Sequence, residues 1–296
     1  MDDTTISTGA SGTLRNHTVL VTGAGRGIGR SIALAFARAG ANMVCVSRTK
    51  SEIDSLAEEI SISHGTLALA IAADVASLSD VTEIFQQAIQ KFGHIDVLVN
   101  NAGIARFDSL QLPTFDFDIW SRIIDVNLRA PVNLIRHVLP DMLSRGKGTI
   151  ISIGSRSAVA NIPFMSAYST SKTGLLRFHQ CLEREISGSG VGNFYIQPGN
   201  VPTGLIHSDE IVDPEAAEVF PALWQMLKRT KEISTTPVDV VADACVRLAT
   251  DQNSMLLSGL YIDVERGLDQ ILEDLRNEEN CRIENEQLYR LKVDHL

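Results

Sequence analysis

Tyr168 and Lys172 are the residues of this sequence best suited to acid–base chemistry. They stand four positions apart in the segment AYSTSKTG, and positions i and i+4 lie on one face of a helix. An ammonium group held beside a phenol stabilises the phenolate, so we expect a lowered pKa for Tyr168 and proton exchange near neutral pH. Ser155, thirteen residues upstream, supplies a hydroxyl that could join the pair.

A glycine-rich turn lies near the N-terminus, between an apolar run and a helix-length segment. Its sequence, TGAGRGIG (residues 22–29), has the spacing G-x-x-x-G-x-G rather than G-x-G-x-x-G. Glycine lets the chain turn sharply and brings backbone N–H groups close to a pyrophosphate at the N-terminus of the next helix. Such a turn can be only a tight connection, but its place between a first strand and a first helix predicts dinucleotide binding. The turn residues assigned to the cofactor are Gly23, Arg26, Gly27, Ile28 and Gly29.

Short apolar runs alternate with amphipathic segments along the chain, as in βαβ units with a parallel sheet. The runs are near-continuously apolar, which is typical of strands covered on both faces. We predict an α/β fold: a single doubly wound Rossmann-type domain with a seven-stranded parallel sheet. The predicted strands are residues 17–22, 42–47, 67–73, 95–100, 148–154, 192–197 and 259–263. The predicted helices are residues 31–40, 51–60, 80–93, 115–145 (interrupted by Pro131 and Pro140) and 166–186.

No linker rich in Pro, Gly or Ser divides the chain, so we expect one domain over residues 15–266 after a polar segment, 1–14. Residues 203–236 lack a strand signal but carry large apolar side chains, which predicts a helical substrate flap over the C-terminal edge of the sheet. Residues 267–296 form a predicted charged C-terminal extension. The extension could be a solvated helix or could cover the site or a partner.

The chain resembles the short-chain dehydrogenase/reductase family, of the single-domain kind, over roughly residues 15–264. The resemblance lies in the order and spacing of several motifs. Besides the glycine-rich turn and the Tyr168–Lys172 pair, these are Asn100-Asn101-Ala102-Gly103 after the fourth strand, Asn127 in DVNL, Ser155 in IGSRS, and Pro198-Gly199 leading to Thr203.

The resemblance implies a catalytic tetrad. Tyr168 would be the general acid in carbonyl reduction, or the base in alcohol oxidation. Lys172 would lower the pKa of Tyr168 and bind the nicotinamide ribose. Ser155 would hydrogen-bond the substrate oxygen, and Asn127 would position a water that links Lys172 to solvent. These roles suit hydride transfer, because the alkoxide that it makes needs immediate protonation.

The cofactor expected is NADP(H). An NAD site usually carries an acidic residue at the end of the second strand, for the ribose 2′-hydroxyl. This chain has Ser47-Arg48-Thr49 there, with Glu52 further on, and a guanidinium suits a 2′-phosphate. Arg26 could flank the same phosphate. The resemblance further implies adenine contacts from Asp74 and Val75, carboxamide contacts from Val201 and Thr203, and cofactor contacts from Asn100, Asn101, Ala102, Gly103, Pro198 and Gly199.

The composition limits the kinds of partner that the protein is expected to bind. A net charge of −10 argues against nucleic acid, and no apolar run approaches the ~18 residues of a membrane span. The four scattered cysteines predict reduced thiols and a cytoplasmic location. The histidines have no metal-ligand spacing, so no metal is expected. The family resemblance implies a homodimer or homotetramer.

These patterns leave three functions open. The first is an NADPH-dependent reductase that converts a ketone or aldehyde of a small hydrophobic molecule to an alcohol, or the reverse. The alternative is a protein of the same fold that uses NADP(H) for non-redox chemistry such as cyclisation, dehydration or isomerisation. The third is a non-enzymatic NADP(H) sensor, which we expect to lack Ser155, Tyr168 or Lys172. All three residues are present.

Overall fold

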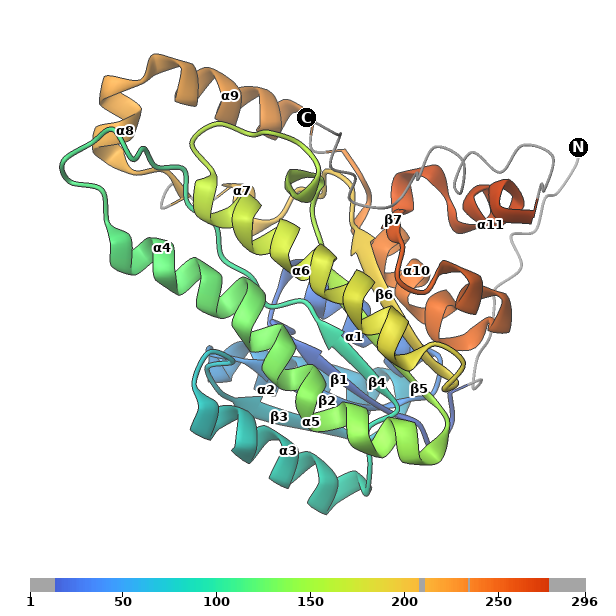
Figure 1. Cartoon of the computed structure of the whole chain (residues 1–296). Coiled ribbons are helices and arrows are strands. Elements are labelled where there is room, and N and C mark those ends of the chain that lie inside the picture. Colours follow the sequence, from blue (N-terminus) through green and yellow to red (C-terminus); the bar gives the residue numbers. More distant parts are fainter. Residues whose placement is uncertain (1–13, 208–210, 234, 277–296) are drawn as a thin grey trace, which may run out of the picture.

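The computed structural model describes residues 14–207, 211–233 and 235–276, which form a parallel sheet between two layers of helices (Figure 1). Its strand order is β3-β2-β1-β4-β5-β6-β7, and every neighbouring pair is parallel. The predicted seven-stranded doubly wound sheet is therefore confirmed. The strands are β1 (Thr18–Thr22), β2 (Asn42–Ser47), β3 (Ala68–Ala72), β4 (Val97–Asn100), β5 (Gly148–Ile153), β6 (Val191–Gln197) and β7 (Tyr261–Asp263).

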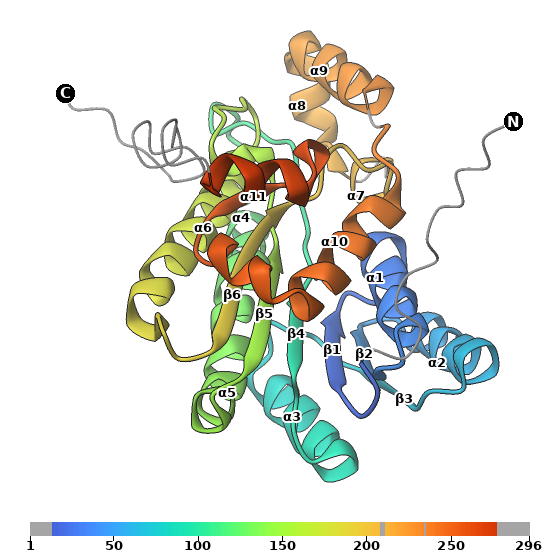
Figure 2. The ribbon, with the colours of Figure 1, turned by 90° about the vertical axis from the view of Figure 1, so that its right-hand side faces the viewer.

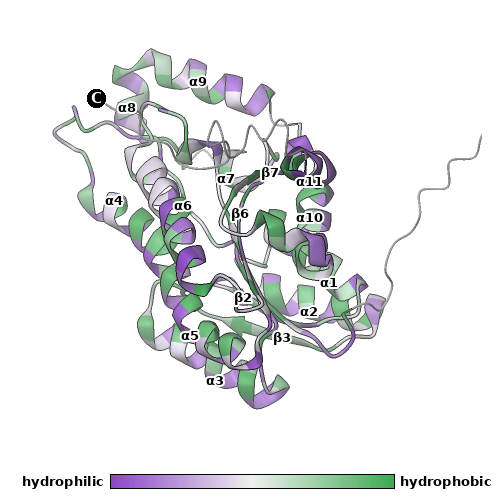
Figure 3. Ribbon diagram, turned by 45° about the vertical axis from the view of Figure 1, so that its right-hand side comes forward, coloured by the Kyte–Doolittle hydropathy of each residue, from purple (hydrophilic) through white to green (hydrophobic). Residues whose placement is uncertain are grey.

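Helices cover both faces of the sheet (Figure 2). Buried side chains of one group form a core with one face: α1 (Gly27–Arg38), α2 (Lys50–His64), α10 (Val238–Thr250) and α11 (Leu268–Arg276). A second group packs on the other face: α3 (Leu78–Phe92), α5 (Ala130–Arg145) and α6 (Ser166–Ile186). Hydrophobic positions recur between hydrophilic ones along these helices (Figure 3). This is the pattern of an amphipathic helix, which turns one apolar stripe to the core.

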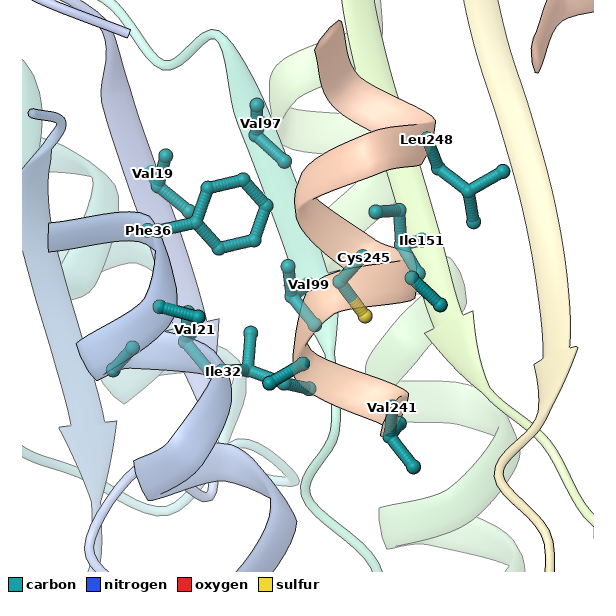
Figure 4. Packing of buried hydrophobic residues seen from close by; sticks show 14 of the residues in the cluster. Val19, Val21, Ile32, Phe36, Val97, Val99, Ile151, Val241, Cys245 and Leu248 are labelled. Carbon is teal, nitrogen blue, oxygen red and sulfur yellow. The ribbon is translucent and has the colours of Figure 1, made fainter. Parts of the chain in front are cut away.

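The first core shows why the strands read as apolar throughout. Phe36 of α1 and Cys245 of α10 lie over valines of β1 and β4 (Figure 4). Every residue of β1 is buried, because helices on both sides leave none of its side chains for solvent. The strand order reverses between β1 and β4, where the two halves of the sheet meet. Ligands of open α/β sheets bind outside such a reversal of strand order.

One predicted detail is wrong. Residues 117–145 run as helix through both prolines: α4 (Phe117–Ile124), a π-helical turn η1 (Asp125–Arg129) and α5. Pro131 lies in the first turn of α5, directly after the π turn, and does not end the helix. Pro140 lies inside α5 without ending it. The irregular point is the π turn, which is a feature often found at functional sites.

The segment predicted as a substrate flap, called the flap below, contains the helices α7 (Gly204–His207), α8 (Pro214–Val219) and α9 (Pro221–Glu232). Helices α8 and α9 lie beyond one end of the sheet in Figures 1 and 2. In the C-terminal extension, Leu268, Ile271 and Leu272 of α11 are buried in the first core. The rest of the extension (277–296), Cys281 and residues 1–13 lie outside the described residues.

Candidate active site

The C-terminal ends of the strands border a cleft of about 480 Å³. The cleft brings together most of the residues that the sequence assigned to cofactor and catalysis. Predicted residues that line it are Gly23, Arg26, Gly27, Ile28, Ser47, Arg48, Thr49, Asp74, Val75, Asn101, Ala102, Gly103, Ser155, Tyr168, Lys172, Pro198, Gly199, Val201 and Thr203. Gly29, Asn100 and Asn127 do not line the cleft, but Gly29 and Asn127 contact residues that do.

Close packing between the glycine-rich turn and the end of β4 shapes one wall. The Asn101 side-chain amide donates hydrogen bonds to the backbone oxygens of Thr22 (2.9 Å) and Gly23 (3.1 Å). A Cβ at Gly23 would lie 2.9 Å from this amide nitrogen, and a Cβ at Gly29 would collide with it and with the Gly23 oxygen. These two glycines therefore leave room for Asn101.

The N-terminus of α1 fits an anion. Its N-cap residue, Arg26, makes no side-chain capping hydrogen bond, and the first turn contains no acidic residue. The first N–H groups of a helix lack helical partners and carry the positive end of its dipole. Gly27 has a φ of 55°, and a Cβ added there would lie 3.5 Å from the methyl carbon of Thr203. This donor set suits the pyrophosphate of a dinucleotide.

Tyr168 and Lys172 lie together on the first turns of α6, opposite the end of β5. The Lys172 ammonium nitrogen is 5.7 Å from the centre of the Tyr168 ring and donates to the backbone oxygen of Ile153 at 2.7 Å. The Ser155 hydroxyl oxygen accepts hydrogen bonds from the backbone N–H of Ser157 (3.1 Å) and from its hydroxyl (3.0 Å).

Burial dominates the ionisation of this pair. It raises the pKa of Tyr168 above 10, which a hydrogen bond with Ser155 partly opposes. Burial also lowers the pKa of Lys172 to about 8. The expected lowering of the Tyr168 pKa is therefore wrong for this structure, because desolvation of the phenolate outweighs its neighbours. A protonated tyrosine at neutral pH is suited to donating a proton.

Asn127 lies buried beneath the cleft in the π turn η1. Its side-chain oxygen accepts from the Ile104 N–H at 2.9 Å. Its side-chain nitrogen donates to the Ile104 oxygen (2.8 Å) and to the Ser171 hydroxyl (3.1 Å). The side chain thus joins the loop after β4 to α6 beside Lys172. Asn100 is buried nearby and donates to Ser152 at 3.2 Å.

Charged groups of both signs surround the end of β2. Among the described residues, the guanidinium groups of Arg26 and Arg48 have no hydrogen-bond or ion-pair partner. The Glu52 side chain lies against the glycine-rich turn. A Cβ added at Gly25 would lie 2.9 Å from the Cβ of Glu52 and would collide with the Glu52 carboxylate. Asp74 pairs with Arg122. Glu52 lines the cleft but was not assigned to the cofactor from the sequence, because it stands in the first turn of α2 and not at the end of β2.

The opposite end of the cleft is apolar. Tyr168 packs against the flap core, whose buried members include Phe107, Met165 and Ile211. The Phe107 N–H donates to the Ile211 oxygen at 2.6 Å, and Phe107 and Val212 form an isolated parallel β-bridge. Arg106 pairs with Asp213, the N-cap of α8, at 2.5 Å. These contacts connect the flap to the loop after β4.

Two further residues of the site were not predicted. Gln197, at the end of β6, lines the cleft, is buried, and has a side-chain nitrogen without a partner among the described residues. Tyr195, two residues earlier, hydrogen-bonds Ser155 and Lys172 backbone atoms. Both sit in a strand that the sequence predicts only as core, and no spacing marks them as part of a site.

None of the helices in the described ranges is long and apolar enough to cross a membrane. Within the same ranges no cluster of three or more His, Cys, Asp or Glu side chains could hold a metal ion. The cysteines described there, Cys45, Cys181 and Cys245, are free thiols.

Known proteins that resemble this chain are named as dehydrogenases and reductases. The family model for short chain dehydrogenases matches residues 17–211. A short chain dehydrogenase of Pseudocercospora fijiensis (strain CIRAD86) is 35% identical over 283 residues, which cover 95% of this chain and 91% of the relative. The reductase FabG of Staphylococcus epidermidis, a 3-oxoacyl-(acyl-carrier-protein) reductase, is 33% identical over 256 residues, 86% of this chain and 99% of FabG.

A solved structure has the same architecture. A metagenomic short-chain oxidoreductase in complex with NADP superposes with a TM-score of 0.66 at 28% identity, covering 81% of this chain and 93% of the other. Fold, cleft and relatives define an oxidoreductase that uses a nicotinamide dinucleotide. The chain belongs to the short-chain dehydrogenase/reductase family.

Proposed function

We propose that the protein is an NADPH-dependent reductase that converts a ketone or aldehyde of a small hydrophobic molecule to an alcohol, or runs the reverse reaction. The observation that carries the proposal is the convergence of Ser155, Tyr168 and Lys172 at an apolar end of a dinucleotide cleft. Bound NADPH would supply a hydride to the carbonyl carbon. The roles below are those that the chain's own side chains would perform.

The Ser155 hydroxyl would donate a hydrogen bond to the carbonyl oxygen and orient it. Its oxygen already accepts two hydrogen bonds from Ser157, so its own proton is the one that it can donate, toward the Tyr168 oxygen or toward a substrate oxygen. Tyr168 would give its proton to the developing alkoxide. The raised pKa of Tyr168 supports this role, since it keeps the phenol protonated at neutral pH.

Lys172 would hold the ribose hydroxyls and feed protons back to Tyr168. Burial lowers the pKa of Lys172 to about 8, so at neutral pH most of the population carries the charge. Asn127 would support the relay by position, because its amide holds the loop after β4 against α6 at Ser171, next to Lys172.

For the cofactor we propose NADP(H). The unpaired guanidinium groups of Arg26 and Arg48 favour a 2′-phosphate. Glu52 opposes this preference, because a carboxylate accepts hydrogen bonds from a ribose diol and repels a phosphate. We therefore expect NADPH to be preferred, with measurable use of NADH. Asp74, Val75, Val201 and Thr203 line the cleft and would contact adenine and carboxamide.

One assay distinguishes the proposed reductase from the non-redox alternative. NADPH oxidation with a panel of uncharged hydrophobic ketones and aldehydes should be measurable, whereas a protein of non-redox function would bind NADPH without oxidising it. Tyr168→Phe should lower kcat by about 10²–10⁴-fold, as expected for loss of a general acid. Full activity in this variant would refute the assigned mechanism.

We also propose that the protein works in the cytoplasm as a homodimer or homotetramer. The free thiols support a reducing compartment. Light scattering after size exclusion measures the assembly, and a mass that corresponds to the monomer would contradict it.

A further inference from the structure

The hydroxyl group of Tyr195 touches the backbone of two proposed catalytic residues. It accepts a hydrogen bond from the Ser155 N–H at 3.1 Å and donates one to the Lys172 carbonyl oxygen at 3.2 Å. A carbonyl oxygen has two lone pairs, so that of Lys172 can accept this bond beside its helical one. One buried side chain from β6 thus connects the turn after β5 with the first turns of α6.

Gly154 makes this connection sterically possible. Its Cα faces the Tyr195 ring, and a Cβ there would collide with the ring and lie 2.7 Å from the hydroxyl oxygen. The Gly154 N–H also donates to the Ile196 oxygen at 2.6 Å. The residue immediately before Ser155 is therefore a glycine that lets the phenol approach the serine backbone.

The surroundings hold the ring independently of its hydroxyl. Tyr195 is fully buried, and its ring centre lies 6.0 Å from that of His179 and 5.9 Å from that of Tyr261. Burial raises the pKa of Tyr195 well above 10, so the hydroxyl keeps its proton and remains a donor. A phenylalanine would fill the same space without the two hydrogen bonds.

We infer that Tyr195 is a positioning residue for catalysis, whose hydroxyl sets the distance between Ser155 and the Tyr168–Lys172 face of α6. The inference rests on the proposed reductase function. Without the hydroxyl, the Ser155 N–H loses its partner in a part-buried turn, and the turn shifts to find another. A small displacement of the serine hydroxyl is enough to slow hydride transfer, because the carbonyl must be held in a near-attack geometry.

The test compares Tyr195→Phe with Tyr261→Phe. Tyr261 belongs to the same buried cluster, and in the described part of the chain its hydroxyl bonds neither Ser155 nor Lys172. Stopped-flow oxidation of enzyme-bound NADPH by excess carbonyl compound gives a rate constant and an amplitude. The amplitude reports the fraction of active protein, and the rate constant reports the chemistry.

We expect Tyr195→Phe to lower the single-turnover rate constant about ten-fold, with full amplitude and with the KM for NADPH changed less than about two-fold. Tyr261→Phe should match wild type. An equal rate constant in both variants, or a loss of amplitude alone, would overturn the inference. Wild type that never oxidises NADPH would overturn the proposed function and the inference with it. If Tyr195→Phe does not fold, Tyr195→Met removes the same hydroxyl and fills the space with a flexible side chain.

Discussion

Mild acid should destabilise this protein through one buried imidazole. His179 of α6 is fully buried, and burial lowers its pKa from 6.5 to about 4. Its Nδ1 faces the Asn193 side-chain oxygen, and the Asn193 amide nitrogen donates to the His179 backbone oxygen at 2.8 Å. Its Nε2 lies 2.7 Å from the Ser152 hydroxyl. This arrangement suits a neutral ring with the proton on Nδ1.

The sign and size of the effect follow from proton linkage. Between pH 6.5 and about pH 4 the unfolded chain binds a proton that the folded protein excludes, so the free energy of unfolding falls as the pH falls. From neutral pH to about pH 4.5 the loss from His179 alone is about 2.5 kcal/mol. That is a large fraction of the stability of a typical domain.

The assay is urea unfolding at intervals between about pH 7 and pH 4.5 for wild type and His179→Gln. Glutamine can hydrogen-bond both neighbours but does not titrate, so its curve should be flatter by about 2.5 kcal/mol across this range. Carboxylates that titrate in both proteins cancel in the difference. Parallel curves for the two proteins would refute the reasoning, whatever their absolute stabilities.

Three further outcomes are expected. Reductase activity should fall as the pH rises through about 8, because Lys172 then loses its charge. Lys172→Arg should move that fall to higher pH. If the pH profile does not move, the fall in activity belongs to another group. Glu52→Gln should raise the NADPH-to-NADH ratio of kcat/KM several-fold by removing a negative charge near the 2′ position, and an unchanged ratio would exclude Glu52 from cofactor choice. Asp213→Asn should weaken the flap contact with Arg106 and raise the KM for the carbonyl compound more than that for NADPH; equal changes would mean that the contact does not shape the substrate end.

The alternation of apolar runs and amphipathic segments was enough to predict the sheet and its parallel order. A parallel strand that is buried on both faces must be apolar throughout. That pattern lies within a few consecutive residues, so the sequences of β1 and β4 show it without coordinates. The glycine-rich turn and the Tyr168–Lys172 spacing were readable for the same reason, since a turn and a helix face depend on near neighbours in the chain. Family membership followed from the order of these motifs and is confirmed.

Long-range contacts decided what the motifs could not. Whether Tyr168 lies in water or in an apolar pocket depends on the flap core, so the direction of its pKa shift was predicted wrongly. Glu52 reaches the glycine-rich turn only because α2 packs where it does. Tyr195 reads as an ordinary strand residue, yet β6 carries its hydroxyl to Ser155, forty residues away in sequence. Residue types and short spacings thus determined the fold and the candidate chemistry. Only the tertiary structure decided the ionisation, the cofactor surroundings and the positioning contacts, because burial and electrostatics depend on groups that are distant in the chain.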